Sequence, residues 1–205
     1  MSNATTDTTP AFVAPASASV PIGASLTFDA VYEEHFAFVW RSVRRLGSPD
    51  AHVDDAVQEV FLVVHRRLKE FEGRSSLRSW LYGIVANVVR DCRRTALRKD
   101  PCVRSAGGGP DVDSLVDPSG CSPQESLERA DAVRVLHDLL ETLDWQKREA
   151  FVLVELEQMS VPEVAEAIGV NANTVYSRVR AARQAFNEAA ARYRAREERR
   201  ARCVD

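Results

Sequence analysis

Residues 160–186 have the sequence SVPEVAEAIGVNANTVYSRVRAARQAF, and this stretch decides the fold of the C-terminal half. Ser160 and Glu163 stand three positions apart and form the capping box that typically opens a helix. Gly169 permits the sharp turn that ends this short helix, and Asn171 is a suitable cap for a second one. Two helices that cross closely at a tight turn predict a helix-turn-helix.

The outer face of the second helix carries polar and basic side chains. A helix that enters the major groove of DNA needs such a face, because that groove is about 12 Å wide and lined by hydrogen-bonding groups. The candidate DNA-contacting residues are Asn173, Thr174, Ser177, Arg178, Arg180 and Arg183. From Arg178 onward nine arginines stand against four acidic residues, so this end is basic although the formal net charge is −3. An ordinary helical hairpin with a solvated charged face remains the alternative for this motif alone.

Upstream of this motif, apolar residues recur at spacings of three and four, which is typical of helices with one buried face. Three such stripes run over 28–46, 53–68 and 77–92, and their short connections predict a compact bundle. Gly and Pro residues interrupt the pattern from Asp100 to Gly120 and predict a linker. A capping sequence at 122–125 then restarts the helical pattern.

The sequence therefore predicts an all-α protein with two small helical domains, a three-helix bundle and a helix-turn-helix domain, joined by a flexible linker. No strand pattern and no internal repeat is present. The predicted division is a disordered segment at 1–25, a helical domain at 26–99, the linker at 100–121, a helix-turn-helix domain at 122–190 and a basic tail at 191–205.

Composition argues against several classes of function. The longest apolar run, Leu81 to Val89, is far shorter than the roughly 18 residues that a membrane span needs. The first forty residues contain neither Lys nor Arg, so no signal peptide is expected and we predict a cytoplasmic protein without membrane insertion. No nucleophile–base pair, phosphate-binding glycine loop or pair of catalytic carboxylates is present, so we expect neither an enzyme nor a cofactor.

The cysteines and histidines form no metal-binding pattern. The cysteines, none of which belongs to a Cys-x-x-Cys pair, are Cys92, Cys102, Cys121 and Cys203. We expect reduced thiols, and a regulatory disulfide between Cys102 and Cys121 stays open as an alternative. His52 and Asp55 share a helix face, but a carboxylate-bridged metal site needs Glu-x-x-His motifs and inward acids on several helices. We therefore predict no metal site.

Two segments of the N-terminal bundle carry a family resemblance. The segments DAVQEVF (55–61) and FEGRSSLRSWLY (71–82) resemble conserved regions 2.2 to 2.4 of the bacterial sigma-70 family of RNA polymerase sigma factors. The helix-turn-helix that follows some ninety residues later resembles region 4 of the same family. The linker stands where region 3 would be, and this absence points to the extracytoplasmic-function class.

The resemblance implies a role for an acidic helix face in the first domain. Asp55, Gln58 and Glu59 lie at positions i, i+3 and i+4 of one predicted helix and therefore share a face. In the family this face docks on the clamp helices of the polymerase largest subunit. Without the family context, a solvated acidic face would be the better interpretation of these three residues.

The resemblance also implies where the two promoter elements bind. The loop at 71–76 and the helix that follows resemble the part that opens the minus-ten element and captures an unstacked base. Unstacking a base costs free energy, and contacts in a protein pocket must offset that cost. The implied minus-ten residues are Arg74, Ser75, Ser76, Arg78, Asn87, Arg90, Asp91 and Arg94. The six polar residues of the helix-turn-helix become the minus-thirty-five contacts. Asp91 stands where relatives carry asparagine, and it either alters base preference or only pairs with a neighbouring arginine. Trp80 falls on the apolar stripe and is expected in the core.

The implied partners are core RNA polymerase, promoter DNA and an anti-sigma factor. A helix-turn-helix regulator whose first domain senses a signal or dimerises is the alternative function. Promoter-specific initiation by core polymerase would separate the two, because only a sigma factor supports it.

Overall fold

The computed structural model describes residues 26–47, 52–99 and 123–202, and every regular element in these ranges is helical. The elements are α1 (Phe28–Arg45), α2 (Val53–Arg67), the short 3-10 helix η2 (Leu68–Glu70), α3 (Leu77–Lys99), α4 (Pro123–Glu141), α5 (Trp145–Phe151), the π turn η4 (Val152–Leu156), α6 (Val161–Ile168) and α7 (Ala172–Arg202). The predicted all-α architecture with two helical domains is confirmed. The predicted N-terminal segment and linker lie outside the described residues.

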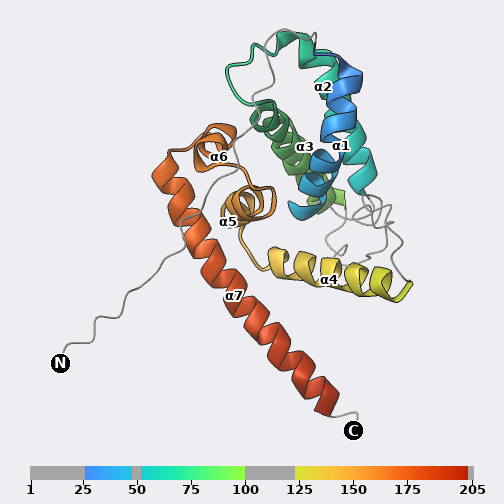
Figure 1. Ribbon diagram of the computed structural model, residues 1–205, viewed down its shortest axis with the longest axis vertical. Helices are drawn as coiled ribbons and strands as arrows, with labels where there is room; N and C mark the ends of the chain where they lie inside the picture. Colours follow the sequence, from blue (N-terminus) through green and yellow to red (C-terminus); the bar gives the residue numbers. More distant parts are fainter. Residues whose placement is uncertain (1–25, 48–51, 100–122, 203–205) are drawn as a thin grey trace, which may run out of the picture.

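Helices α1, α2 and α3 form the N-terminal bundle, with their apolar stripes facing one another (Figure 1). Thr27 caps α1, because its side chain accepts a hydrogen bond from the Ala30 N–H at 3.3 Å. Val39, Val60 and Val85, one from each helix, are fully buried at the centre. Helix α2 begins at Val53, where the second apolar stripe begins.

The C-terminal helices begin and end where local chemistry predicts. Asp144 caps α5 through the Lys147 N–H at 3.0 Å, and both bonds of the Ser160–Glu163 capping box are present. Gly169 ends α6 in the left-handed conformation, with φ of +68°. Asn171 accepts a hydrogen bond from the Thr174 N–H at 2.8 Å at the start of α7. The helix-turn-helix therefore consists of α6, the turn at Gly169 and the first turns of α7.

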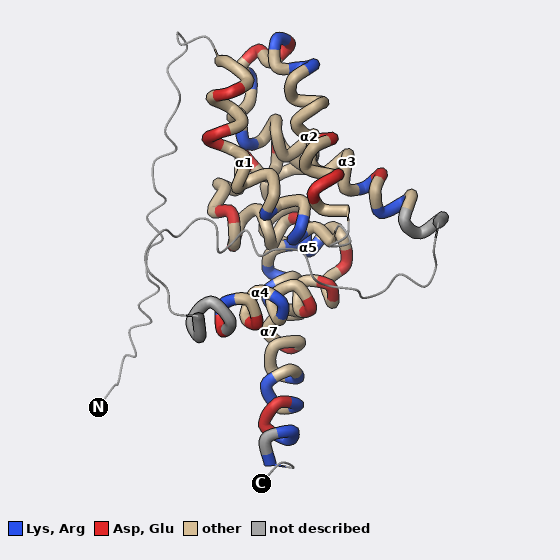
Figure 2. Tube along the Cα trace, turned by 90° about the vertical axis from the view of Figure 1, so that its right-hand side faces the viewer, with Lys and Arg blue, Asp and Glu red and all other residues tan. Residues whose placement is uncertain are grey.

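Two features of this half were not predicted. The helix that Asp144 opens passes into the π turn η4, whose last bond joins the Glu157 N–H to the Val152 carbonyl at 2.9 Å. Helix α7 continues through 31 residues to Arg202 and projects away from the other helices (Figure 1). Figure 2 shows that basic residues dominate this projecting end.

The two halves pack directly against each other. A single buried cluster contains Val85 of α3 together with Ala150, Leu153 and Val164 of the C-terminal helices. The sequence predicted two separate domains and gave no sign of this contact. Helices α5 and α6 therefore lie on the bundle, and their position decides which of its surfaces are exposed.

None of the helices in the described ranges combines the length and the apolar character that crossing a membrane would require.

Candidate polymerase and DNA contact surfaces

The acidic residues of α2 lie on the side of the helix that faces solvent. Asp55, Gln58 and Glu59 are exposed, whereas Ala56 and Val57 between them are buried in the core of the bundle. The structure therefore brings the three predicted residues together on one accessible face. A rigid helix presents them in fixed register, which suits docking on a protein surface.

Leu62 extends this face, and the sequence analysis did not include it. It follows Gln58 by four residues and Glu59 by three, and 43% of its surface is exposed. An apolar side chain beside charged ones is a typical anchor for a protein partner. The spacing could have identified Leu62, but its place in an apolar run, next to Phe61, concealed it.

The loop before α3 forms the floor of an open hollow. Glu70, Phe71, Glu72, Arg74, Ser75 and Trp80 line it. The Phe71 and Trp80 rings pack 5.2 Å apart and close its apolar side, while Arg74 forms an ion pair with Glu72. Trp80 is half-buried against the bundle core, as predicted, and it also lines this hollow. Arg74, Ser75 and the two rings thus lie around one open hollow.

Ser76 has a structural task in addition to its predicted one. Its hydroxyl accepts a hydrogen bond from the Ser79 N–H at 3.2 Å and so caps α3. Farther along the helix, Asn87 and Asp91 are exposed on one face. Asn87 accepts a hydrogen bond from Arg90 at 3.1 Å, and Asp91 forms an ion pair with Arg94 at 3.2 Å. The pairing that the sequence offered as the plain interpretation of Asp91 is therefore present.

The predicted minus-thirty-five residues lie on several sides of α7. Asn173, Ser177 and Arg180 are exposed on the face opposite the buried Val175 and Val179. Thr174 is half-buried, and its hydroxyl donates a hydrogen bond to the Asn171 side chain at 3.0 Å. Arg178 is half-buried at the margin of the exposed face, and Arg183 is held by Glu155 of η4 at 2.6 Å. The exposed face of α7 therefore has Asn173, Ser177 and Arg180 at its centre, and Arg178 and Arg183 lie beside it.

Tyr176 is a further exposed residue of α7 that the sequence analysis missed. It is 61% exposed, the largest value among the big apolar side chains that the described ranges expose. It lies three residues after Asn173 and four before Arg180, so it borders the same face. An exposed aromatic ring on such a helix can contact thymine methyl groups or sugars.

Cys92 is the cysteine whose surroundings the structure describes. Burial raises the pKa of its thiol, and the acidic groups of Asp91, Glu59 and Asp55 raise it further. The thiol is therefore kept protonated and poorly nucleophilic. Cys102, Cys121 and Cys203 lie outside the described residues. Within those residues, no group of three or more His, Cys, Asp or Glu side chains is placed to hold a metal ion.

Comparison with known proteins identifies the family. The family model for Sigma-70 region 2 matches residues 31–99, and the model for Sigma-70, region 4 matches residues 134–186. RNA polymerase sigma factor NccH of Alcaligenes xylosoxydans xylosoxydans is 30% identical over 161 residues, which cover 78% of this chain and 85% of NccH. The ECF RNA polymerase sigma-E factor of Escherichia coli K12 is 30% identical over 148 residues, which cover 68% of this chain and 74% of the relative.

A solved structure agrees with these matches. CnrH in complex with the cytosolic domain of CnrY has a TM-score of 0.58 to this structure at 25% identity, covering 78% of this chain and 85% of CnrH. The resemblance found in the sequence is therefore confirmed over both helical domains. This chain belongs to the extracytoplasmic-function class of the sigma-70 family, the non-catalytic regulatory subunits that direct RNA polymerase to promoters.

Proposed function

We propose that this sigma factor works through three surfaces on two units, 26–99 and 122–190. The exposed face of α2 binds core polymerase, the loop before α3 and α3 itself engage the minus-ten element, and α7 recognises the minus-thirty-five element. The chain itself carries no catalytic activity or cofactor and acts by positioning polymerase. The observation that carries the proposal is the joint exposure of Asp55, Gln58 and Glu59 on one helix face.

The α2 surface consists of Asp55, Gln58, Glu59 and Leu62. Its acidic groups select a basic partner surface, and Leu62 provides the apolar contact that a stable interface needs at its centre. Because α2 is packed on both neighbouring helices, little ordering is needed on binding.

The minus-ten surface has a base-capture part and a phosphate part. Arg74 and Ser75 line the hollow beside Phe71 and Trp80, where an unstacked base gains stacking and hydrogen bonds, and Ser76 follows them at the start of α3. The positions on α3 that contact the strand are Arg78, Asn87, Arg90, Asp91 and Arg94. Asn87 donates and accepts hydrogen bonds, so it is suited to a base edge, whereas the arginines are suited to phosphates.

The minus-thirty-five surface lies at the start of α7. Asn173, Thr174, Ser177 and Arg178 approach base edges, and Arg180 and Arg183 contact phosphates. Tyr176 adds an apolar contact at the border of this face. Arg183 must exchange its ion pair with Glu155 for a phosphate, and the exchange is easy because both partners are partly exposed.

The proposed partners beyond DNA and core polymerase include an anti-sigma factor. The family implies such a restrainer, and the related CnrH forms a complex with the cytosolic domain of CnrY. The place of action is the cytoplasm, where polymerase and the chromosome are found.

In vitro transcription with core polymerase tests this proposal. The purified chain should make core polymerase initiate at a small set of genomic sites that share both elements. Reversing the charge at Asp55 and Glu59 together, to Lys, should abolish initiation and core binding while helical content stays the same. Glu33→Lys, at an exposed acid of α1, is the matched control and should retain both. Specific DNA binding without any initiation would favour an ordinary helix-turn-helix regulator instead.

A further inference from the structure

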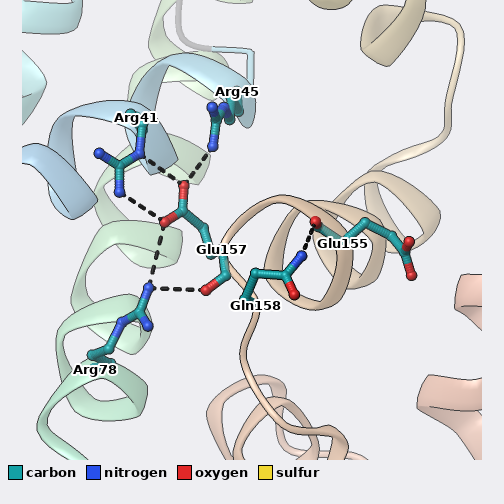
Figure 3. Close-up of polar contacts among 6 residues, drawn as sticks. All are labelled: Arg41, Arg45, Arg78, Glu155, Glu157 and Gln158. Carbon is teal, nitrogen blue, oxygen red and sulfur yellow. Dashed lines mark hydrogen bonds and ion pairs between the residues drawn. The ribbon is translucent and has the colours of Figure 1, made fainter. Parts of the chain in front are cut away.

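The carboxylate of Glu157, directly after η4, is held by three arginines of the N-terminal bundle. Arg41 donates to it from Nε at 3.2 Å and from Nη2 at 3.1 Å, and Arg45 donates from Nη1 at 2.6 Å. Arg78 reaches the Glu157 carbonyl at 3.1 Å and its carboxylate at 3.4 Å (Figure 3). The Glu157 side chain is only 1% exposed, so this is a buried anion site between α1 and α3.

The backbone around Glu157 is shaped to deliver it. The π turn η4 precedes it, and Gln158, which follows, has φ of +55°. This left-handed conformation is unfavourable for a residue with a side chain. A hydrogen bond from Gln158 to the Glu155 carbonyl, at 2.6 Å, helps to hold the conformation. Two unusual backbone features therefore flank Glu157, whose ion pairs join the two halves.

The three arginines require an anion. Arginine keeps its charge at any physiological pH, and its planar group binds carboxylate and phosphate oxygens equally well. Side-chain exposure is 27% for Arg41, 13% for Arg45 and 37% for Arg78. Three partly buried positive groups that converge on one point repel one another when no anion lies between them.

The packing of α6 on α3 also covers part of the proposed minus-ten surface. Ser75, Trp80 and Asn87 line a second hollow, whose opposite side is Glu166 and Ala167 of α6. The Ser79 hydroxyl donates to the Glu163 carbonyl at 3.2 Å, which holds α6 against α3. The C-terminal helices thus place acidic groups where promoter phosphates are expected.

This closed arrangement is incompatible with reading both promoter elements. The minus-ten and minus-thirty-five elements are named by their positions before the start site, so they lie roughly 25 base pairs apart. This is about 85 Å along the duplex at 3.4 Å per base pair. A domain of this size has a radius of gyration of only about 13 Å, and here the two units touch. The units must separate on the promoter, and Glu157 must then leave the arginines.

We propose that Arg41, Arg45 and Arg78 form an oxyanion site with two alternative occupants: Glu157 in the closed free protein and a backbone phosphate of promoter DNA in the open one. The inference rests on the proposed minus-ten role of α3, because Arg78 follows the base-capture loop by only two residues and brings the site next to the strand. Glu157 is then an internal competitor of DNA, and removing its charge both opens the protein and frees the site.

Two measurements on the full-length chain test this. X-ray scattering reports separation of the units, and fluorescence anisotropy reports binding of a short single-stranded DNA of randomised sequence, which suffices because phosphate contacts carry no sequence information. Glu157→Gln should enlarge the radius of gyration and tighten DNA binding by about tenfold, equivalent to about 1.4 kcal/mol. Glu188→Gln removes the same charge from an exposed position of α7 and should change neither measurement.

A second variant separates competition from opening. Arg45→Ala should also open the protein, but it should not tighten DNA binding, because it damages the site itself. Binding of the strand weakens as salt rises, and the slope of log K against log salt concentration measures how many phosphates are contacted. Adding Arg41→Ala to Glu157→Gln should make this slope shallower by about 0.7, the value for one phosphate contact on a single strand. Far-UV circular dichroism verifies that every variant keeps its helices.

The outcomes are distinct. A Glu157→Gln protein that stays compact overturns the proposal. A Glu157→Gln protein that opens but binds the strand only as tightly as the wild type also overturns the proposal. So does a salt slope that Arg41→Ala leaves unchanged. In either case Glu157 only holds the two units together. If polymerase carrying the wild-type chain still requires a minus-ten sequence, the proposed function survives either failure. If it requires none, the proposed function fails by itself.

Discussion

The phenolic hydroxyl of Tyr82 donates a hydrogen bond of 3.2 Å to Oε1 of Glu149, and both side chains are buried where α3 meets α5. Burial raises the pKa of the Glu149 carboxyl, and the hydrogen bond from Tyr82 opposes that rise. Burial likewise raises the pKa of Tyr82 well above its usual value, so Tyr82 remains a donor. This pair is a further polar link between the halves, separate from the ion pairs of Glu157.

Tyr82→Phe should lower the free energy of unfolding by about 1–3 kcal/mol, because it leaves the buried Glu149 carboxylate without its donor while the ring volume is retained. Urea denaturation at neutral pH measures this. Tyr32→Phe, at a tyrosine that is 41% exposed, is the control and should change the value by less than about 0.5 kcal/mol. Equal effects in the two variants would show that the Tyr82 hydroxyl adds nothing to stability.

Gly47 and Gly73 allow a matched test of the contact between α1 and α5. Both have positive φ, +83° and +70°, so an alanine at either position is strained by about 1–2 kcal/mol. A Cβ at Gly47 would also collide with the Arg148 guanidinium, which is buried and donates to the Leu46 carbonyl at 3.5 Å. A Cβ at Gly73 meets nothing.

Gly47→Ala should therefore destabilise the protein more than Gly73→Ala in urea denaturation, because the buried Arg148 guanidinium has to move. The extra loss should vanish when Arg148 is replaced by Ala in both backgrounds. A difference that persists without Arg148 would place its origin in the backbone alone.

The caps and the apolar stripes could be predicted from the sequence because they depend on residues within one or two turns. Asp144, Ser160 and Gly169 act where their local chemistry indicates. The contact of Glu157 with Arg41 joins residues 116 positions apart, and no local pattern encodes it. The π turn η4 was missed because the apolar spacing of residues 151–156 indicates an ordinary α-helix. Leu62 and Tyr176 were overlooked because an apolar residue on a helix is first expected in the core.

The stability of the closed protein should depend on His137 of α4. Its pKa is lowered to about 4, from a usual value near 6.5, first by burial and then by the positive charges of Arg44, Arg45 and Arg148. The native protein therefore binds fewer protons here than the unfolded chain between pH 6.5 and about 4. The stability associated with neutral His137 is complete above pH 6.5 and is lost as the pH falls through this window.

His137→Gln should accordingly flatten the decline of the urea midpoint on acidification from pH 6.5. The comparison with the wild type matters, because burial also lowers the pKa of His35, which adds a decline of the same sign. His52→Gln, which replaces an exposed imidazole in the same way, is the control for the substitution itself and should change the urea midpoint at neutral pH by less than about 0.5 kcal/mol of stability. If the urea midpoints of the wild type and His137→Gln fall equally with pH, His137 is not a source of the acid decline.

Arg178 and Arg180 should affect promoter selection differently. Arg178 is half-buried at the margin of α7 and so keeps a fixed direction, which suits a bidentate contact with a base, worth about 1–3 kcal/mol of discrimination. Arg180 is exposed and suits a phosphate. In transcription from a randomised minus-thirty-five library, Arg178→Ala should relax preference at one position, whereas Arg180→Ala should weaken all sequences alike. Uniform loss in both variants would make Arg178 a phosphate contact as well.

Asp91 should set a base preference in the minus-ten element. Its ion pair with Arg94 is exposed at both ends, 72% for Asp91 and 60% for Arg94, and such pairs contribute about 0–1 kcal/mol. The pair therefore does not prevent Asp91 from meeting DNA. Ionised Asp only accepts hydrogen bonds, so it favours a base with an exposed amino group, such as cytosine, whereas Asn also donates.

Selection from a randomised minus-ten library with polymerase carrying wild type or Asp91→Asn decides the matter. The variant should change the preferred base at one position and leave the remaining positions as they are. Arg94→Ala breaks the same ion pair from its other end but keeps the Asp91 carboxylate, so it should weaken binding while preserving the wild-type preference. If Asp91→Asn selects the wild-type sequence, Asp91 acts only on Arg94 and the base preference arises elsewhere on α3.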